Sequence, residues 1–233
     1  MCERRSIPLE MYTEFPMRES ARDRAYRILK KAIIMLELEP GTMVSEADLA
    51  AKIGFSRTPV REALIELSKT KIVEVYPQKG SMISKIDYNL VEEARFMRLV
   101  LEVAVVELAC DAASEDDVLA LEENLARQNF CLANNSADKL LELDDMFHKR
   151  IFLIANKAQT YYFLESMAVH FDRVRKMSLN TIKDIKIVSD HQSILVAVKE
   201  KDKAAAKFHV EKHLSRYKID EELIRQKYPT YFK

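Results

Sequence analysis

Four side chains in the second half of the sequence have the chemistry of a metal site. Asp144 and His148 are four residues apart, so on a helix they share one face about one turn from each other. His191 and His213 lie in two further segments where apolar residues recur at helical spacing. Three imidazoles and one carboxylate that face inward from three helices can bind a divalent transition metal. Zinc is the usual ion for this donor set, with nickel or manganese as alternatives.

These positions also allow a purely structural explanation. A histidine on an apolar helical face more often makes a hydrogen bond in the core than it binds an ion. Asp145 is an alternative carboxylate, although it points about 100° away from Asp144 around the helix. His209 is an alternative imidazole one turn before His213, and His170 is a further candidate that we leave out of the set.

A second set of informative residues, at positions 45–67, predicts a helix-turn-helix. Ser45 and Asp48 form an S-x-x-D capping box at the start of a short helix. Gly54 follows where the chain must reverse, and glycine adopts positive φ at little cost. Apolar residues then recur at helical spacing up to Leu67, which predicts a second helix.

The polar side of this second helix carries cations at its start. Arg57 and Arg61 can clamp phosphate or pair bidentately with guanine, and the Thr58 hydroxyl can bind phosphate or a base edge. Ser56 is placed to cap the helix. A charged helical face is often simply solvated, so the interpretation depends on what surrounds these side chains.

Two short strand-prone runs, at residues 72–76 and 81–84, follow the second helix. Lys79 and Gly80 lie in the turn between them, where Lys79 can reach a DNA backbone or minor groove. Together with the preceding helices this pattern predicts a winged helix-turn-helix, which places a helix in the major groove. It indicates a gene regulator rather than an enzyme.

Residues 40–80 resemble the winged helix-turn-helix of the GntR family of bacterial transcription regulators. Residues 56–64 read SRTPVREAL and match the core of that family at every position, and Pro40-Gly41 and Leu49-Ala50 match its PG and LA pairs. The resemblance implies that Arg57, Thr58 and Arg61 approach DNA.

The same resemblance implies that the wing glycine, here Gly80, packs close to the DNA. The sequence departs from the family at two positions. Lys71 stands where a glycine is frequent, and Ala47 stands where some members carry a DNA-contacting arginine.

Residues 88–220 resemble the FCD effector domain, the all-helical partner found in the FadR subgroup of that family. Its D-x-x-x-H, H-x-x-I and H-L patterns match at Asp144 to His148, at His191 and at His213. The resemblance implies that Asp144, His148, His191 and His213 bind a metal.

Related regulators respond to small organic acids or sugar acids, so the resemblance also implies a small carboxylate effector. Arg98, Arg173 or Arg175 would hold the far end of that ligand; a surface position, or an ion pair with Glu102, is the alternative for each. A homodimer would place two recognition helices on a palindromic operator in double-stranded DNA.

Two other classes of function fit part of this pattern. A metal with open coordination positions can activate water, which would suit a metal-dependent hydrolase. A helical interaction module with a structural metal is the other alternative. The sequence shows no nucleophile motif, no phosphate-binding loop and no general base beside the ligands, and a hydrolase has no use for the DNA-binding segment. We therefore expect no enzymatic activity.

Length and composition predict two mostly α domains. The 233 residues are enough for two small domains, and the scarcity of Gly (3) and Pro (6) suits helices with short connections. We expect a flexible arm (1–18), a winged helix-turn-helix domain (19–85) and an all-α antiparallel bundle that binds metal and effector and dimerises (86–230). The expected helices outside the helix-turn-helix are 20–38, 92–111, 115–133, 137–155, 160–179, 183–199 and 203–227.

Charge and cysteine content set further limits. The net charge is zero, but residues 1–85 carry 15 Lys and Arg against 12 Asp and Glu, and the remainder carries 22 against 25. We therefore expect DNA affinity to come from a few placed cations and from dimerisation. The three cysteines are widely spaced and odd in number, which favours a reducing cytoplasm over a disulfide framework. No apolar run approaches the roughly 20 residues that span a bilayer, so we expect no membrane partner.

Overall fold

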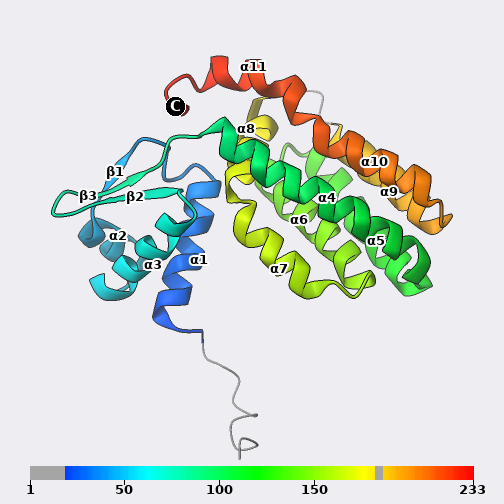
Figure 1. The fold of residues 1–233 in the computed structure, drawn as a ribbon, viewed down its shortest axis with the longest axis horizontal. Helices are drawn as coiled ribbons and strands as arrows, with labels where there is room; N and C mark the ends of the chain where they lie inside the picture. The colour runs from blue at the N-terminus through cyan, green and yellow to red at the C-terminus, as the bar shows by residue number, and fades with distance from the viewer. Residues whose placement is uncertain (1–18, 182–185) are drawn as a thin grey trace, which may run out of the picture.

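The computed structural model describes residues 19–181 and 186–233, and confirms a mostly α chain with a small β-wing. The first part, which we call the head, consists of α1 (Ala21–Ile34), β1 (Met43–Val44), α2 (Glu46–Ile53), α3 (Arg57–Lys69), β2 (Val73–Tyr76) and β3 (Gly80–Ile83). The second part, which we call the bundle, consists of α4 (Tyr88–Ala112), α5 (Glu115–Ala133), α6 (Ala137–Ile154), α7 (Ala158–Met167), α8 (Val169–Thr181), α9 (Ile187–Lys199), α10 (Lys203–Ser215) and α11 (Tyr217–Lys227). Figure 1 shows the head beside one end of the bundle, with the wing directed away from it.

The expected arm over residues 1–18 and the expected helix start at residue 183 lie outside the described residues. The exact domain limits at 19, 85 and 230 stay predictions. Among the described residues, no helix combines the length and the apolar composition that crossing a bilayer requires.

Local signals in the sequence set several helix starts. The Ser45 hydroxyl accepts a hydrogen bond from the Asp48 N–H at the start of α2. Ser114 and Asp117 form a reciprocal capping box at α5, and Gly54 ends α2 in the left-handed conformation. Ser56 stands at the N-cap of α3, but the prediction that its side chain caps the helix is wrong, because the hydroxyl makes no cap hydrogen bond.

The head is built on one buried apolar cluster and a three-stranded sheet. Leu29 and Ile33 of α1 share that cluster with Leu64 and Leu67 of α3. The sheet has the order β1-β3-β2 and is antiparallel throughout. Its strand β1 was not predicted, because two residues are too few to show an alternating pattern.

Two long helices predicted for the bundle are each divided. The expected helix over 160–179 is α7 followed by α8, which meet at Ala168, and the expected helix over 203–227 is α10 followed by α11, which meet at Arg216. No glycine or proline marks either bend. The bend at Ala168 lets α8 turn into the interior, where its polar residues Asp172 and Arg173 are buried alongside its apolar ones. Packing rather than local propensity sets these boundaries.

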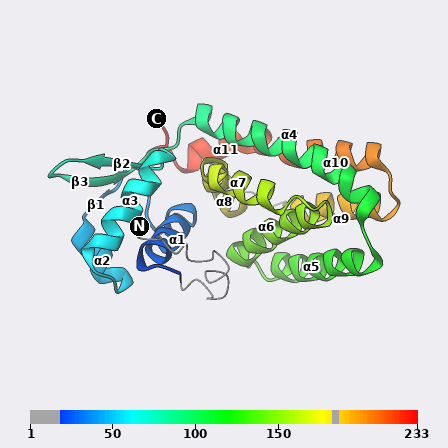
Figure 2. The same cartoon turned by 60° about the horizontal axis from the view of Figure 1, so that its bottom comes forward.

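Helix α8 joins the bundle to the head through buried polar contacts. The Arg173 guanidinium donates to Ser84 O at 2.7 Å. His170 Nε2 lies 2.6 Å from Thr70 O, so this nitrogen donates, and His170 Nδ1 accepts from Arg173 at 3.2 Å. Val169 of the same helix belongs to the apolar cluster of the head. The head is therefore hydrogen-bonded to the bundle, and Figure 2 shows the head beside α8.

The junction predicts a pH dependence of stability. Burial, and next the positive charge of Arg173, lower the pKa of His170 to about 4, below its ordinary value of about 6.5. Between these values the unfolded chain binds the proton and the folded chain does not, so stability falls as pH falls through this window. We expect His170→Gln to lose less stability than the wild type between pH 6.5 and 4.5, as measured by urea unfolding. An identical pH dependence in the two proteins would contradict this.

Candidate functional site

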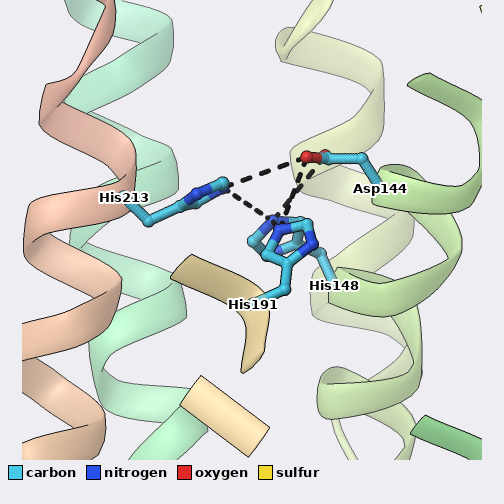
Figure 3. A group of neighbouring side chains, drawn as sticks. All are labelled: Asp144, His148, His191 and His213. Carbon is cyan, nitrogen blue, oxygen red and sulfur yellow. Dashed lines mark hydrogen bonds and ion pairs between the residues drawn. The ribbon is translucent and has the colours of Figure 1, made fainter. Parts of the chain in front are cut away.

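Three helices of the bundle bring Asp144, His148, His191 and His213 together (Figure 3). Helix α6 supplies Asp144 and His148 one turn apart, α9 supplies His191, and α10 supplies His213. Each residue offers one ligand atom, and these atoms all lie within 4.8 Å of one another. The four residues proposed from their spacing thus form one group in the interior.

The three imidazoles direct their Nε2 atoms toward the centre of this group. His148 Nε2 lies 3.2 Å from His213 Nε2 and 3.3 Å from His191 Nε2. Two nitrogen ligands at about 2.0–2.1 Å from a tetrahedral zinc ion are separated by about 3.3 Å, so the observed spacing fits a shared ion. Asp144 Oδ1 lies 3.5 Å from His191 Nε2 and completes a mixed N and O donor set.

Buried partners on the outer ring nitrogens orient two of the imidazoles. His148 Nδ1 lies 2.6 Å from a Glu102 carboxylate oxygen, and His191 Nδ1 lies 2.8 Å from Gln128 Oε1. Since these oxygens can only accept, both Nδ1 atoms carry the proton and both Nε2 atoms keep a lone pair. This is the arrangement in which an outer partner fixes a metal-binding histidine.

The third imidazole has a weaker version of the same support. His213 Nδ1 is buried and makes no hydrogen bond, and the nearest carboxylate oxygen, from Asp190, is 3.8 Å away. Asp190 is held in turn by a two-point contact with Arg216. A small movement of His213 toward Asp190 would satisfy its orphaned Nδ1–H.

Sequence reasoning did not single out Gln128 as part of the site. Gln128 is fully buried on α5, where it continues the stripe formed by Leu121 and Leu125 at helical spacing. A polar side chain in an apolar stripe was the available signal, because a buried amide needs a specific partner.

Electrostatics favour neutral His148 and His191 and an ionised Asp144. Burial and the neighbouring His213 hold the pKa of His191 well below its usual range, and burial also lowers the pKa of His148. For Asp144, burial acts to raise the pKa, but Arg175 and the imidazoles outweigh it, so the pKa lies well below the usual range. Neutral imidazole and ionised carboxylate are the forms that bind a metal.

The charges around the cluster do not balance without a cation. Carboxylates outnumber guanidiniums by four to two in the connected network of Glu102, Asp144, Asp145, Asp172, Arg98 and Arg175. Arg98, Glu102 and Asp144 are the most buried members of this network. An unpaired charge that is shielded from water in this way is costly. One divalent cation would supply the two positive charges that the network lacks.

The three arginines proposed for effector binding divide between two places. Arg98 donates to Glu102, and Arg175 contacts Asp144, Asp145 and Asp172. Both line a cavity of about 240 Å³ beside the cluster. Arg173 makes its contacts at the junction with the head instead, at Ser84 and His170.

Neither alternative ligand belongs to the group of four. Asp145 lines the cavity and pairs with Arg175, and burial raises its pKa to about 6. His209 lies on α10 beside Phe208, with its ring centroid 5.3 Å from that ring. Among the described residues, the group that could hold a metal ion consists of the four residues named above.

The proposed DNA-contacting residues lie on one face of the head. Ser56, Arg57 and Thr58 are exposed at the start of α3, and Arg61 is exposed one turn later. Arg61 lies 3.9 Å from a Glu46 carboxylate oxygen.

A groove of about 550 Å³ joins this helix to the wing. Arg61 and Ile65 of α3 line one side, and Lys79 and Gly80 of the wing line the other. The cation of the wing turn and the second arginine of the helix therefore border the same hollow, as a shared contact surface for a DNA backbone requires.

Two turns in the head show where glycine matters. Gly80 has φ +100°, and a Cβ there would lie 2.8 Å from Val44 O of β1. Its place in the wing thus follows from the close approach of β1, independently of any DNA contact. Lys71 follows the C-cap of α3 and has φ +60°, the left-handed conformation that glycine adopts without strain.

Comparisons with known proteins identify both parts of the chain. Residues 21–83 match "Bacterial regulatory proteins, gntR family", and residues 93–216 match the FCD domain. The chain is 31 % identical over 208 residues to the transcriptional repressor RspR of Escherichia coli, covering 89 % of this chain and 91 % of that protein.

Further relatives and a solved structure agree with these matches. The chain is 26 % identical to the gluconate operon transcriptional repressor of Bacillus licheniformis, covering 75 % of this chain and 74 % of the relative. The structure of E. coli McbR/YncC superposes with a TM-score of 0.76 at 21 % identity, covering 90 % of this chain and 99 % of the other. The matched proteins are transcription regulators rather than enzymes.

The backbone conformations of Gly80 and Lys71 predict different effects of substitution on stability. We expect Gly80→Ala to destabilise the head by at least about 1 kcal/mol, because the new methyl group meets Val44 O in a strained conformation. Lys71→Gly relieves left-handed strain and should be neutral or stabilise the protein by up to about 1 kcal/mol. Urea unfolding of both variants tests this, and a Gly80→Ala variant as stable as the wild type would show that the β1 contact is unimportant.

Proposed function

This chain belongs to the GntR family of bacterial regulatory proteins and carries an FCD effector domain, and from that premise we propose how its DNA binding is controlled. It is a DNA-binding transcription regulator. A homodimer binds a palindromic operator in the cytoplasm, and a small organic acid bound beside a metal in the bundle changes the affinity for that operator. The observation that carries the second part is the convergence of three imidazole Nε2 atoms and Asp144 next to a cavity lined by arginines.

The exposed start of α3 supports direct contact with DNA. Arg57, Thr58 and Arg61 project from the first turns of the helix that enters the major groove in proteins of this shape. Lys79 extends the cationic surface into the wing. A dimer would present two such surfaces to successive major grooves, which explains how a chain with zero net charge can bind a polyanion.

The donor set of the bundle supports a transition metal, most simply zinc. Asp144, His148, His191 and His213 would hold it, with Glu102 and Gln128 fixing two of the imidazoles. When bound, the ion supplies a buried positive charge that attracts a carboxylate. Nickel and manganese fit the same donor types.

Arg98 and Arg175 support an acid as the effector. Both guanidiniums line the cavity and both lie against Asp144, at 3.7 Å in the case of Arg98. When Asp144 serves as a metal ligand, its hold on these guanidiniums weakens, and their N–H groups can turn to a carboxylate of the ligand. The name of one relative ties that protein to a gluconate operon, and gluconate is an organic acid with a single carboxylate.

The DNA-binding part predicts losses that depend on which arginine is removed. Arg57→Ala should cost about 1–3 kcal/mol of binding free energy and relax selectivity at one base position if it reads a base edge. Arg61→Ala should weaken binding while metal content stays the same. The measurement is fluorescence anisotropy on duplexes selected by the wild-type protein from a random pool. Arg127→Ala, an exposed arginine of α5, is the matched control, and an Arg61→Ala variant that binds as tightly as this control would contradict the assignment.

The metal part predicts a loss of bound ion without a loss of assembly. His191→Ala should lower metal content, measured by mass spectrometry of the purified protein, and should leave the dimer intact in size-exclusion chromatography. His209→Ala, which removes a histidine outside the cluster, should keep full occupancy. Full occupancy in His191→Ala would show that the ligand set is wrong. If metal removal unfolds the bundle while no acid changes DNA affinity, the ion is structural.

A further inference from the structure

The cavity beside the cluster of Asp144, His148, His191 and His213 lies between the bundle and the head. One face of α1 and its C-cap form one of its walls, through Arg27, Lys30, Lys31, Ile34 and the cap residue Met35. These positions follow helical spacing, so they share a side of α1 that differs from the side buried in the head. Figures 1 and 2 both show α1 on the side of the head that faces the bundle.

The opposite wall of the cavity belongs to the bundle. Arg98 of α4 and Arg175 of α8 lie on this wall, next to Asp144 of the cluster. Leu141, Leu164 and Tyr161 add apolar surface. The cavity therefore has guanidiniums at its inner end, apolar surface along its walls, and the cations of α1 on the side of the head. Five carboxylates also line it, and those of Glu102, Glu142, Asp145 and Asp172 are paired with Arg98, Arg175 or Lys31.

Two lysines of α1 tie the head to the bundle across this space. Lys30 Nζ donates to Glu165 O at 3.0 Å, and Lys31 Nζ lies 2.7 Å from a Glu142 carboxylate oxygen. The Lys31 and Glu142 side chains are 63 % and 47 % exposed, so the pair is weak and open to competition. An anionic group entering from solvent can take over either ammonium.

We propose that α1 of the DNA-binding head forms part of the effector site, and that the effector is a dicarboxylate. One carboxylate faces Arg98 and Arg175, and the other competes with Glu142 for Lys31 and adds a contact to Lys30. This inference rests on the proposed control by an organic acid. It adds that the ligand touches the head directly and that two anionic ends are needed.

Direct contact gives a short physical route from ligand to DNA. Leu29 and Ile33, on the other side of α1, pack in the same apolar cluster as Leu64 and Leu67 of α3. A ligand that moves Lys31 away from Glu142 changes how α1 sits against the bundle, and α3 moves with α1. A ligand shifts DNA affinity only through a difference in binding to two arrangements, and the contact with α1 supplies that difference.

The test measures binding of dicarboxylates and monocarboxylates of three to six carbons to the metal-loaded full-length protein by calorimetry. We expect at least one dicarboxylate to bind more tightly than the monocarboxylate of equal length. Lys31→Ala should weaken that dicarboxylate about three- to fivefold, as expected for a partly exposed ion pair, and change the monocarboxylate by less. Glu142→Gln should strengthen the same dicarboxylate, because Lys31 loses its competitor.

The opposite signs of the two variants exclude general damage to the fold as the cause. Lys199→Ala is the matched control, since Lys199 and Glu122 form an exposed pair of similar geometry between two other helices. If a dicarboxylate binds and shifts DNA affinity equally in the wild type and in Lys31→Ala, the role of α1 is wrong and the proposed function survives. If monocarboxylates bind as well as dicarboxylates, the need for two anionic ends is wrong. If no acid binds the wild type, the proposed function itself fails.

Discussion

Asp144 is an ionised carboxylate in the interior of the bundle, and much of the bundle is arranged around its charge. Its side chain is 3 % exposed and is surrounded by the imidazoles of His148, His191 and His213 and by the guanidinium of Arg175. Burying such a charge is costly unless several partners share it. The helices α6, α8, α9 and α10 each supply at least one of these partners, so the packing of the bundle and the construction of the site depend on each other.

Two helices, α8 and α1, each contact both the head and the bundle. Helix α8 places Asp172 and Arg175 in the network around the cluster, and it places His170 and Arg173 against the head. Helix α1 belongs to the head, where its apolar side is buried, and its basic side lines the cavity beside the bundle. These contacts offer a route by which a change at the cluster would reach α3.

The sequence was sufficient wherever a short local pattern carries the structure. Residues 56–64 predicted the recognition helix. The D-x-x-x-H spacing of Asp144 and His148, together with His191 and His213 in apolar helical patterns, predicted the four residues of the cluster. Features that depend on contacts between residues far apart in the chain could not be predicted from the sequence. The bend at Ala168 follows from how α8 packs, the role of Gln128 depends on a histidine 63 residues away, and Arg173 faces the head because of that same bend. The two-residue strand β1 exists through its pairing with β3.

The central claim is that metal, acid and DNA are linked in one equilibrium. The most direct measurement is operator affinity determined in four states: metal-loaded or chelator-stripped protein, each with and without a saturating dicarboxylate. The account predicts that the acid changes the operator Kd by about 5-fold or more in metal-loaded protein and has no effect on stripped protein. An operator Kd that is the same in all four states would contradict it.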